Sequence, residues 1–282
     1  RRDYNPRRVI HVPELPEVET VVRGLRSRVL GFTVDDVQIH DEELLRGVEP
    51  ETLKAEVEGS KLTDVRRRGK YILLEFDKGG LLAIHLRMTG KLLVIPDDEE
   101  TDYQRISFFF REENKLVMDN MRRFGTLDLM GSEKDEPLSS LGLEPFREDY
   151  RWEEFRELFE TTQPLKLLLL DQGKLAGLGN IYANEILFRA GLSPFKSGEE
   201  TGDPERRLLY ELIPKVLTEA IEENGTTFDT FKDSSGDPGE FQDFLRVFQR
   251  EGDPCPNCGT EIEKVKQSGR STYYCPNCQS GS

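Results

Sequence analysis

The chain contains 282 residues, 36% of them hydrophobic, and no apolar run approaches the length of a membrane span. This length favours two ordinary domains, and because no apolar stretch follows the arginines near the start, we expect a soluble cytoplasmic protein without a secretory signal. The formal net charge is −15, which argues against a protein that binds polyanions over its whole surface. The charges are segregated, however, with acidic runs at 97–100 and 133–136 and basic clusters at 66–70 and 122–123, which leaves room for a local basic groove.

Residues 16–30 carry apolar side chains at helical spacing, which predicts one amphipathic helix. Strand-like runs separated by turn residues follow as far as residue 130, at 62–66, 71–76, 81–86, 92–95, 106–110 and 116–118. This order predicts an all-β sandwich or barrel with one helix attached.

The apolar period becomes helical from residue 152, and we expect helices at 152–160, 165–171, 183–190 and 204–224. A glycine-rich connection occupies residues 173–180, and a tail that bears Gly, Pro and Cys begins at residue 252. The boundary between the two lobes is expected within residues 137–147. The predicted fold class is therefore α+β with several domains.

All four cysteines lie in the tail as two Cys-x-x-Cys pairs separated by sixteen residues: Cys255, Cys258, Cys275 and Cys278. Two such turns supply four thiolates in a tetrahedron, which predicts a zinc site. The alternative is two disulfides, which a reducing compartment disfavours. Four thiolates leave no open coordination position, so one zinc ion would be structural and would stabilise a β-hairpin across residues 260–274.

Residues 13–20 are PELPEVET, which by itself fits the first turn of a helix, where prolines and carboxylates are common. The octapeptide also resembles the amino-terminal motif of the formamidopyrimidine-DNA glycosylase family. The resemblance continues in family order through RGL, RGKY, HLRMTG, RRFG, GLGNIYANE, GTT and GRST, at residues 23–25, 68–71, 85–90, 122–125, 177–185, 225–227 and 269–272. It therefore extends from residue 13 to the four-cysteine tail.

The resemblance implies an N-terminal β-sandwich with a leading helix at 13–136, a helical helix–two-turn–helix DNA-binding domain at 137–250 and a zinc-finger β-hairpin at 251–282. It also implies a bifunctional DNA glycosylase and AP lyase of base excision repair, associated with the nucleoid. Such an enzyme acts as a monomer on double-stranded DNA that contains an oxidised purine, such as 8-oxoguanine or a formamidopyrimidine. Schiff-base chemistry removes the base, and β,δ-elimination then cuts the strand.

In the family the nucleophile is the secondary amine of an N-terminal proline, which corresponds to Pro13. In this sequence Val12 precedes Pro13, and the peptide bond between them makes the proline nitrogen an unreactive amide. We therefore expect residues 1–12 to be a non-native extension, with Val12 in the place of an initiator methionine, as translation from a GTG codon produces. The alternative is a genuine extension with a different nucleophile, such as Lys70.

Three further residues match catalytic positions of the family. Glu14 corresponds to the general acid/base beside the amine, and Glu17 would support the same site. Lys70 matches the lysine that donates a proton during β-elimination, and Arg270 matches the finger arginine assigned to δ-elimination and phosphate contact. Without the resemblance, Lys70 would be an exposed lysine at a strand end.

Five residues match DNA-binding positions of the family, in two groups. Met88, Arg122 and Phe124 correspond to side chains that fill the gap left by an everted nucleotide, with Arg122 facing the orphaned base. From pattern alone, Met88 and Phe124 would instead be core residues. Lys166 and Asn180 correspond to phosphate contacts of the helical lobe, where a glycine-rich turn exposes backbone N–H groups.

The chain departs from the family pattern in three places: Asn120-Met121 replaces the usual Asp-Pro, residues 103–105 lack the common His-x-His, and residues 161–162 lack a common lysine. The nearest rival function is that of the sister endonuclease VIII branch, which acts on oxidised pyrimidines. Leu15 and the HLRMTG motif favour the purine branch. Rival functions of a different class are a catalytically inactive DNA-binding module, which a blocked Pro13 would create, and a structural zinc-ribbon protein, which leaves residues 13–20 unexplained.

Overall fold

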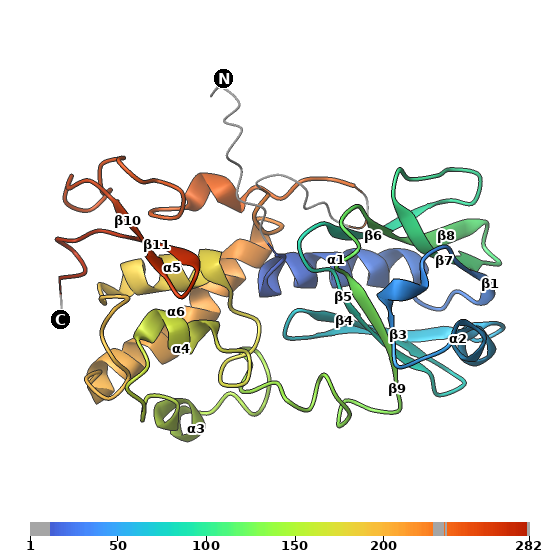
Figure 1. The fold of residues 1–282 in the computed structure, drawn as a ribbon, viewed down its shortest axis with the longest axis horizontal. Helices are drawn as coiled ribbons and strands as arrows, with labels where there is room; N and C mark the ends of the chain where they lie inside the picture. Colours follow the sequence, from blue (N-terminus) through green and yellow to red (C-terminus); the bar gives the residue numbers. More distant parts are fainter. Residues whose placement is uncertain (1–11, 228–233, 235, 281–282) are drawn as a thin grey trace. The chain divides into compact units, whose positions relative to one another are not determined.

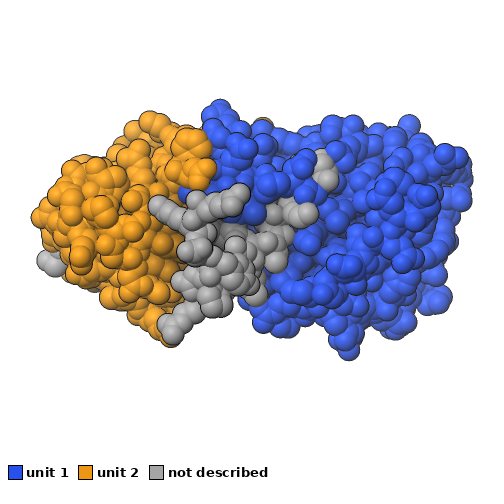
Figure 2. Space-filling view, turned by 90° about the horizontal axis from the view of Figure 1, so that it is seen from above, with its two compact units in different colours: residues 1–139, 221–242 blue, residues 140–220, 243–282 orange. Residues whose placement is uncertain are grey.

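The computed structural model describes residues 12–227, 234 and 236–280, and the chain folds into two compact units (Figure 1; Figure 2). Unit 1 comprises residues 1–139 and 221–242, and unit 2 comprises residues 140–220 and 243–282. The chain therefore leaves unit 1, forms most of the helices of unit 2, and returns to unit 1 before it completes unit 2. The expected limits at 13–136, 137–250 and 251–282 stay predictions.

Unit 1 begins with α1 (Leu15–Val29), the amphipathic helix that the apolar spacing predicts. Pro16 stands in its first turn, where the missing N–H of proline has no cost, and Arg26 and Arg28 in its last turn complement the helix dipole. The apolar side chains of the helix are buried: Val18, Val21, Val22, Leu25 and Val29. The helix therefore directs one face into the core.

Two sheets form the body of unit 1. The first has the order β1 (Val34–Ile39), β7 (Gln104–Phe110), β8 (Asn114–Asn120) and β6 (Gly90–Pro96), with every pair antiparallel. The second has the order β2 (Leu45–Arg46), β9 (Thr126–Met130), β5 (Leu81–His85), β4 (Tyr71–Phe76) and β3 (Leu62–Arg68), with a parallel pair between β2 and β9. Between β1 and β3 lie the short helices η1 (Glu42–Leu44) and α2 (Pro50–Val57).

One hydrophobic cluster joins α1 to both sheets, and its members include Val18, Leu25, Ile72, Leu82, Phe108 and Met118. The helix contacts β3 and β4 of one sheet and β6 of the other (Figure 1). The predicted β-sandwich with a leading helix is therefore confirmed. Its fully buried aliphatic side chains contribute roughly 1.5–3 kcal/mol each relative to an exposed position.

Strand register brings motifs that are far apart in the sequence to the same end of the sandwich. Tyr71 at the start of β4 lies opposite His85 at the end of β5, and His85 lies opposite Thr126 at the start of β9. In the other sheet, Gly90 at the start of β6 lies opposite Asn120 at the end of β8. The turn before β4, the loop from β5 to β6 and the loop from β8 to β9 therefore meet at one end of the sandwich.

Unit 2 contains α3 (Trp152–Glu157), α4 (Leu165–Leu170), α5 (Asn180–Ala190), α6 (Asp203–Glu222) as far as Ala220, η2 (Phe241–Phe244) from Asp243, and the hairpin of β10 (Glu263–Gln267) and β11 (Arg270–Tyr274). The four predicted helices and the hairpin are confirmed. The third helix begins three residues before its predicted start, because Gly179 takes the extended N-cap position and Asn180 is already helical. Within the described part of the chain, no helix combines the length and apolarity that crossing a bilayer requires.

Five elements of unit 1 were not predicted individually: β1, η1, β2, α2 and β9. In β1 the buried positions recur every three residues, because a bulge between Val34 and Asp36 shifts its register against β7. A search for strict alternation misses such a strand. The predicted and observed structures thus differ mainly where charged residues or bulges hide the pattern.

Candidate functional site

The first turn of α1 buries two carboxyl groups next to Pro13, which is itself buried. Glu14 is 3% exposed and Glu17 is 2% exposed. Glu17 Oε2 accepts the backbone N–H of Glu14 at 2.9 Å, and Glu17 Oε1 accepts the backbone N–H of Thr226 at 2.7 Å. Glu17 therefore fixes the main chain directly after Pro13, and the Glu14 side chain is presented from that fixed backbone.

The segment that contains Thr226 can approach α1 because of Gly225. This glycine has φ +77°, and a Cβ there would lie 2.9 Å from Glu17 Oε1 and 3.2 Å from Glu17 Cα. The N–H of Phe241 donates to Gly225 O at 2.9 Å, which ties Gly225 to Phe241. The GTT motif thus supplies both the close approach and the N–H group that holds Glu17.

Lys70 lies in the turn between β3 and β4, and the residue before it, Gly69, has φ +57°. Arg67 Nη1 donates to Gly69 O at 3.2 Å, and Arg67 Nε forms an ion pair with Glu19 Oε2 of α1 at 3.0 Å. The Arg67 side chain is only 7% exposed, so this pair is well shielded from water. The pair ties the turn that carries Lys70 to the N-terminal half of α1.

His85, at the end of β5, supports the loop that carries Met88. Its ring packs edge-on against Tyr71 with centroids 4.8 Å apart, and its Nδ1 accepts the N–H of Arg87 at 3.0 Å. Burial, and after it the positive charges of Arg87, Lys70 and Arg46, lower the pKa of His85 to about 3. The imidazole is therefore neutral, and its acceptor nitrogen can hold Arg87 in its left-handed conformation, φ 53°.

The predicted gap-filling side chains lie on two loops at this end of the sandwich. Met88 is half-buried, Arg122 is exposed, and Phe124 is 52% exposed. The Arg122 guanidinium lies over the Phe124 ring, 5.2 Å from its centroid. The alternative in which Phe124 is a core residue is wrong, since more than half of this residue is exposed.

Arg123 differs from its neighbour Arg122. Its guanidinium binds the buried Asp41 carboxylate, with Nη2 to Oδ1 at 2.7 Å, and also pairs with Glu43 at 3.1 Å. The hydrogen bond from Arg123 holds the pKa of Asp41 below its usual value. The second arginine of the RRFG motif therefore anchors its loop.

In unit 2, Lys166 and Asn180 bind the zinc-finger hairpin. Lys166 is 0% exposed, and its Nζ donates to Ser271 O and Thr272 Oγ1, each at 2.7 Å. Asn180 Nδ2 donates to the same Ser271 O at 3.0 Å. Both side chains thus hold the residue next to Arg270, which is exposed at the start of β11. Their predicted contact with phosphate stays a prediction.

Helix α5 supplies two more anchors that the sequence did not single out. Asn184, one turn after Asn180, accepts the N–H of Tyr273 on its Oδ1 at 2.9 Å. Glu185 is fully buried, and its carboxylate accepts three consecutive backbone N–H groups, those of residues 246–248, at 2.9–3.0 Å. Both residues belong to the GLGNIYANE motif, so the family resemblance could have identified them from the sequence.

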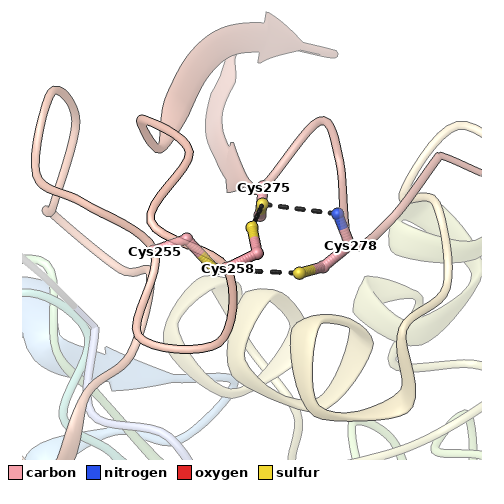
Figure 3. A group of neighbouring side chains, drawn as sticks. All are labelled: Cys255, Cys258, Cys275 and Cys278. Carbon is pink, nitrogen blue, oxygen red and sulfur yellow. Dashed lines mark hydrogen bonds between the residues drawn. The ribbon is translucent and has the colours of Figure 1, made fainter.

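The four cysteines converge into one group at the base of the hairpin (Figure 3). All four Sγ atoms lie within 4.8 Å of one another, and the Sγ atoms of Cys258 and Cys275 are 3.5 Å apart, beyond the roughly 2.05 Å of a disulfide. A zinc ion with bonds of about 2.3 Å to four thiolates needs sulfur atoms about 3.8 Å apart, which fits this cluster. The N–H groups of Asn257 and Cys278 each donate to a cysteine sulfur at 3.4 Å. The predicted structural zinc site is confirmed, and the two-disulfide alternative is wrong.

Three family models match this chain. The formamidopyrimidine-DNA glycosylase N-terminal domain matches residues 12–127, the formamidopyrimidine-DNA glycosylase H2TH domain matches residues 141–232, and the zinc finger found in FPG and IleRS matches residues 252–281. A formamidopyrimidine-DNA glycosylase of Heliobacterium modesticaldum is 41% identical over 276 residues, which cover 95% of this chain and 100% of that protein.

Solved structures agree with these matches. The MutM (Fpg) protein of Thermus thermophilus has a TM-score of 0.86 and 40% identity, covering 96% of this chain and 100% of that one. The Lactococcus lactis Fpg, in a complex with DNA that contains an abasic site, has a TM-score of 0.88 and 34% identity, covering 95% of this chain and 100% of that one.

Proposed function

This chain belongs to the formamidopyrimidine-DNA glycosylase family, and we propose that it excises oxidised purines from double-stranded DNA and then cuts the abasic strand. The proposal includes the finer properties expected of such an enzyme: AP lyase activity, action as a monomer, and association with the nucleoid in the cytoplasm. The observation that carries it is the buried pair of carboxyl groups beside Pro13, one of which is held on both oxygens by backbone N–H groups.

Pro13 is the proposed nucleophile. The lone pair of its nitrogen attacks C1′ of the damaged nucleotide, the bond from C1′ to the base breaks, and the base leaves with the bonding electrons and a proton. The sugar ring opens, and the nitrogen keeps a double bond to C1′ as an iminium. This sequence needs a secondary amine, so the proposal requires a working form in which the peptide bond from Val12 to Pro13 is absent.

Glu14 and Glu17 have separate roles in this proposal. Glu14 transfers protons to the ribose oxygen and the departing base, because it is the carboxyl group adjacent to the reacting nitrogen. Glu17 is a positioning residue, because its oxygens hold the N–H groups of Glu14 and Thr226. A carboxylate committed to two main-chain donors keeps the amine and Glu14 in one geometry.

Lys70 and Arg270 complete the proposed strand cleavage. The iminium acidifies the 2′ proton; its removal breaks the C3′–O bond, and a second elimination breaks the C5′–O bond. Each phosphate leaves as an anion, which a nearby cation stabilises, Lys70 in the first step and Arg270 in the second. The residue next to each of them is held in place, Gly69 by Arg67 and Ser271 by Lys166, which supports such fixed roles.

DNA binding is proposed for two sets of residues. Met88, Arg122 and Phe124 fill the space left by the everted nucleotide, and the exposure of Arg122 and Phe124 supports this role. Lys166 and Asn180 serve the phosphate backbone by fixing Ser271 beside Arg270, and the glycine-rich turn before Asn180 adds N–H groups at a helix start. The zinc ion holds the hairpin that carries Arg270.

Borohydride trapping tests the chemistry, because reduction of the iminium links enzyme and DNA covalently. Two chains are compared on a duplex with 8-oxoguanine opposite cytosine, one that begins at Pro13 and one that retains residues 1–12. We expect a covalent product and strand cleavage only with the first. A Glu14→Gln variant of that chain controls for binding, and its excision rate should fall by roughly 10²–10⁴-fold.

The outcomes separate the rival functions. Equal trapping of both chains would remove Pro13 from its role, and loss of that trapping in a Lys70→Met variant would transfer the role to Lys70. Preference for a thymine glycol duplex over the 8-oxoguanine duplex would assign the chain to the endonuclease VIII type of activity. A chain that binds both duplexes and cuts neither would be a binding module.

A further inference from the structure

We propose that Thr89 and Asn120 are positioning residues that join the loop of Met88 to the loop of Arg122 and Phe124, so that the gap-filling side chains act as one preassembled unit. This inference rests on the proposed DNA-binding role of those three side chains. Thr89 and Asn120 do not themselves contact DNA in this inference. The coupling between the two loops is assigned to a single hydroxyl group, that of Thr89.

The Met88 loop is closed at both of its ends. The N–H of Gly90 donates to Leu86 O at 3.0 Å, and a Cβ at Gly90 would lie only 2.3 Å from that oxygen. Arg87 adopts a left-handed conformation that the bond from its N–H to His85 Nδ1 stabilises. Met88 is therefore presented by a tight turn with little freedom of its own, and its position depends on where this turn is attached.

The second loop is closed in a similar way. The N–H of Arg123 donates to Asn120 O at 3.4 Å, and Arg123 is anchored through its side chain to Asp41. A Cβ at Gly125 would lie 2.1 Å from Asn120 Nδ2, so the loop folds directly over the Asn120 side chain. The backbone of Arg122 and Phe124 thus depends on Asn120 below it.

Thr89 connects the two turns. Its Oγ1 donates to Asn120 Oδ1 at 3.2 Å and accepts the N–H of Arg122 at 3.1 Å. Thr89 is 3% exposed and Asn120 is 0% exposed, so water does not compete for these bonds. One hydroxyl group therefore fixes the distance between the backbone of Met88 and the backbone of Arg122.

A preassembled unit matters because everting a nucleotide costs a few kcal/mol of unstacking and unpairing. Side chains that insert together offset that cost without the further loss of entropy that ordering two separate loops would require. The coupling should therefore affect substrates whose base must be removed from the stack. It should matter little for an abasic nucleotide, which has no base to unstack.

The matched variants are Thr89→Val, which keeps the shape and removes the hydroxyl group, and Thr89→Ser, which keeps the hydroxyl group. Both substitutions are made in the chain that begins at Pro13. Single-turnover rates are measured on a duplex with 8-oxoguanine and on one with a preformed abasic site. Thr89→Val should slow excision roughly ten-fold, the effect of about one lost hydrogen bond, and should leave abasic-site cleavage within about two-fold. Thr89→Ser should stay within about two-fold on both duplexes.

A second readout follows insertion directly. 2-Aminopurine placed beside the lesion becomes fluorescent when it is unstacked, and Thr89→Val should slow that signal by the same factor as excision. Asn120→Leu removes the acceptor of the Thr89 hydroxyl group and should behave like Thr89→Val.

Unchanged excision by Thr89→Val would overturn the inference. An equal loss on both duplexes would also overturn it, because Thr89 would then support the chemistry or the general fold. If the unsubstituted chain that begins at Pro13 were inactive on both duplexes, the proposed function itself would be refuted, and the inference would fall with it. The two failures are thus distinguishable by the unmodified chain alone.

Discussion

Unit 1 and unit 2 both present exposed side chains on short turns, but they hold those turns by different means. In unit 1 the turns are supported by well-buried strands such as β5, in which all five residues are buried, and β8, in which six of seven are buried. In unit 2 the hairpin that carries Arg270 has no buried residue in β10 and only Thr272 and Tyr273 buried in β11. A hairpin with so little apolar burial is not stable by packing alone.

The difference shows what replaces a hydrophobic core when an element is too small to have one. In unit 2 the four thiolates close the base of the hairpin around zinc, and buried polar side chains of α4 and α5 hold its strand. In unit 1 metal ligation is not needed, because the sandwich core fixes the strand ends and main-chain hydrogen bonds refine the turns. Perturbations should therefore act in a different way on each unit.

Removing zinc should have the largest effect and should be confined to unit 2. Cys258→Ser deletes one of four ligands, and structural zinc contributes roughly 10–16 kcal/mol in isolated finger peptides. We expect the hairpin to unfold, zinc content to fall from one ion per chain to none, and DNA affinity to fall roughly a hundred-fold as Arg270 loses its support.

Elemental analysis measures the zinc in this experiment, and hydrogen exchange reports on the amides of β10 and β11. The strands of unit 1 serve as the internal control, since their protection should not change. A hairpin that stays protected without zinc would contradict the proposed division between packing and metal.

In unit 1 the corresponding test disrupts the close approach of Gly225 to α1, which depends on the backbone conformation of this glycine. Gly225→Ala introduces a Cβ 2.9 Å from Glu17 Oε1 at φ +77°. The left-handed conformation costs about 1–2 kcal/mol, and the overlap with α1 should add about 1–3 kcal/mol of stability loss. Excision should fall as well, because Glu17 loses its fixed position.

The control is Gly47→Ala, since Gly47 also has positive φ, +63°, but no atom of the described residues lies within 4 Å of the added Cβ. It isolates the conformational cost, and urea unfolding of both variants gives the difference. Equal losses in the two variants would show that the contact between Gly225 and α1 is unimportant.

Lys166→Met tests how much the buried polar contacts of Lys166 stabilise the hairpin of unit 2. The substitution removes two buried hydrogen bonds to Ser271 and Thr272, and we expect a loss of about 2 kcal/mol, partly offset because a buried charge is also removed. Exchange of the β11 amides should rise. The salt dependence of DNA binding separates this anchoring from a direct phosphate contact, which would lower the slope of log K against log salt by about one.

The last effect concerns the pH dependence of the stability of unit 1. The folded pKa of His85 is about 3, below its ordinary value near 6.5, so the unfolded chain binds a proton that the folded chain does not. The neutral form of His85 therefore contributes stability that is lost as pH falls below about 6.5, and the loss amounts to about 2 kcal/mol at pH 5. His85→Asn, which keeps an acceptor for Arg87, should show a shallower loss between pH 7.5 and pH 5 in urea unfolding. Identical pH profiles would mean that His85 is not the group responsible.

Much of the fold was predictable because it depends on local pattern. The apolar spacing of residues 16–30 directs one helix face inward, and the short apolar runs at residues 71–76 and 81–86 mark buried strands, so α1, β4 and β5 appear where expected. The cysteine spacing determines zinc ligation by itself, since two tight turns place four sulfur atoms in one small volume. The family resemblance added residue roles that no periodicity contains.

Other features depended on contacts between residues far apart in the chain. That Glu17 holds Thr226, that Thr89 joins the Met88 and Arg122 loops, and that Lys166 is buried under Ser271 are all consequences of strand register and helix packing. A sequence lists donors and acceptors, but which of them meet is decided only when the core brings the strand ends together. The amino-acid order therefore determined which chemistry the chain carries, and the tertiary structure decided which backbone groups hold that chemistry in place.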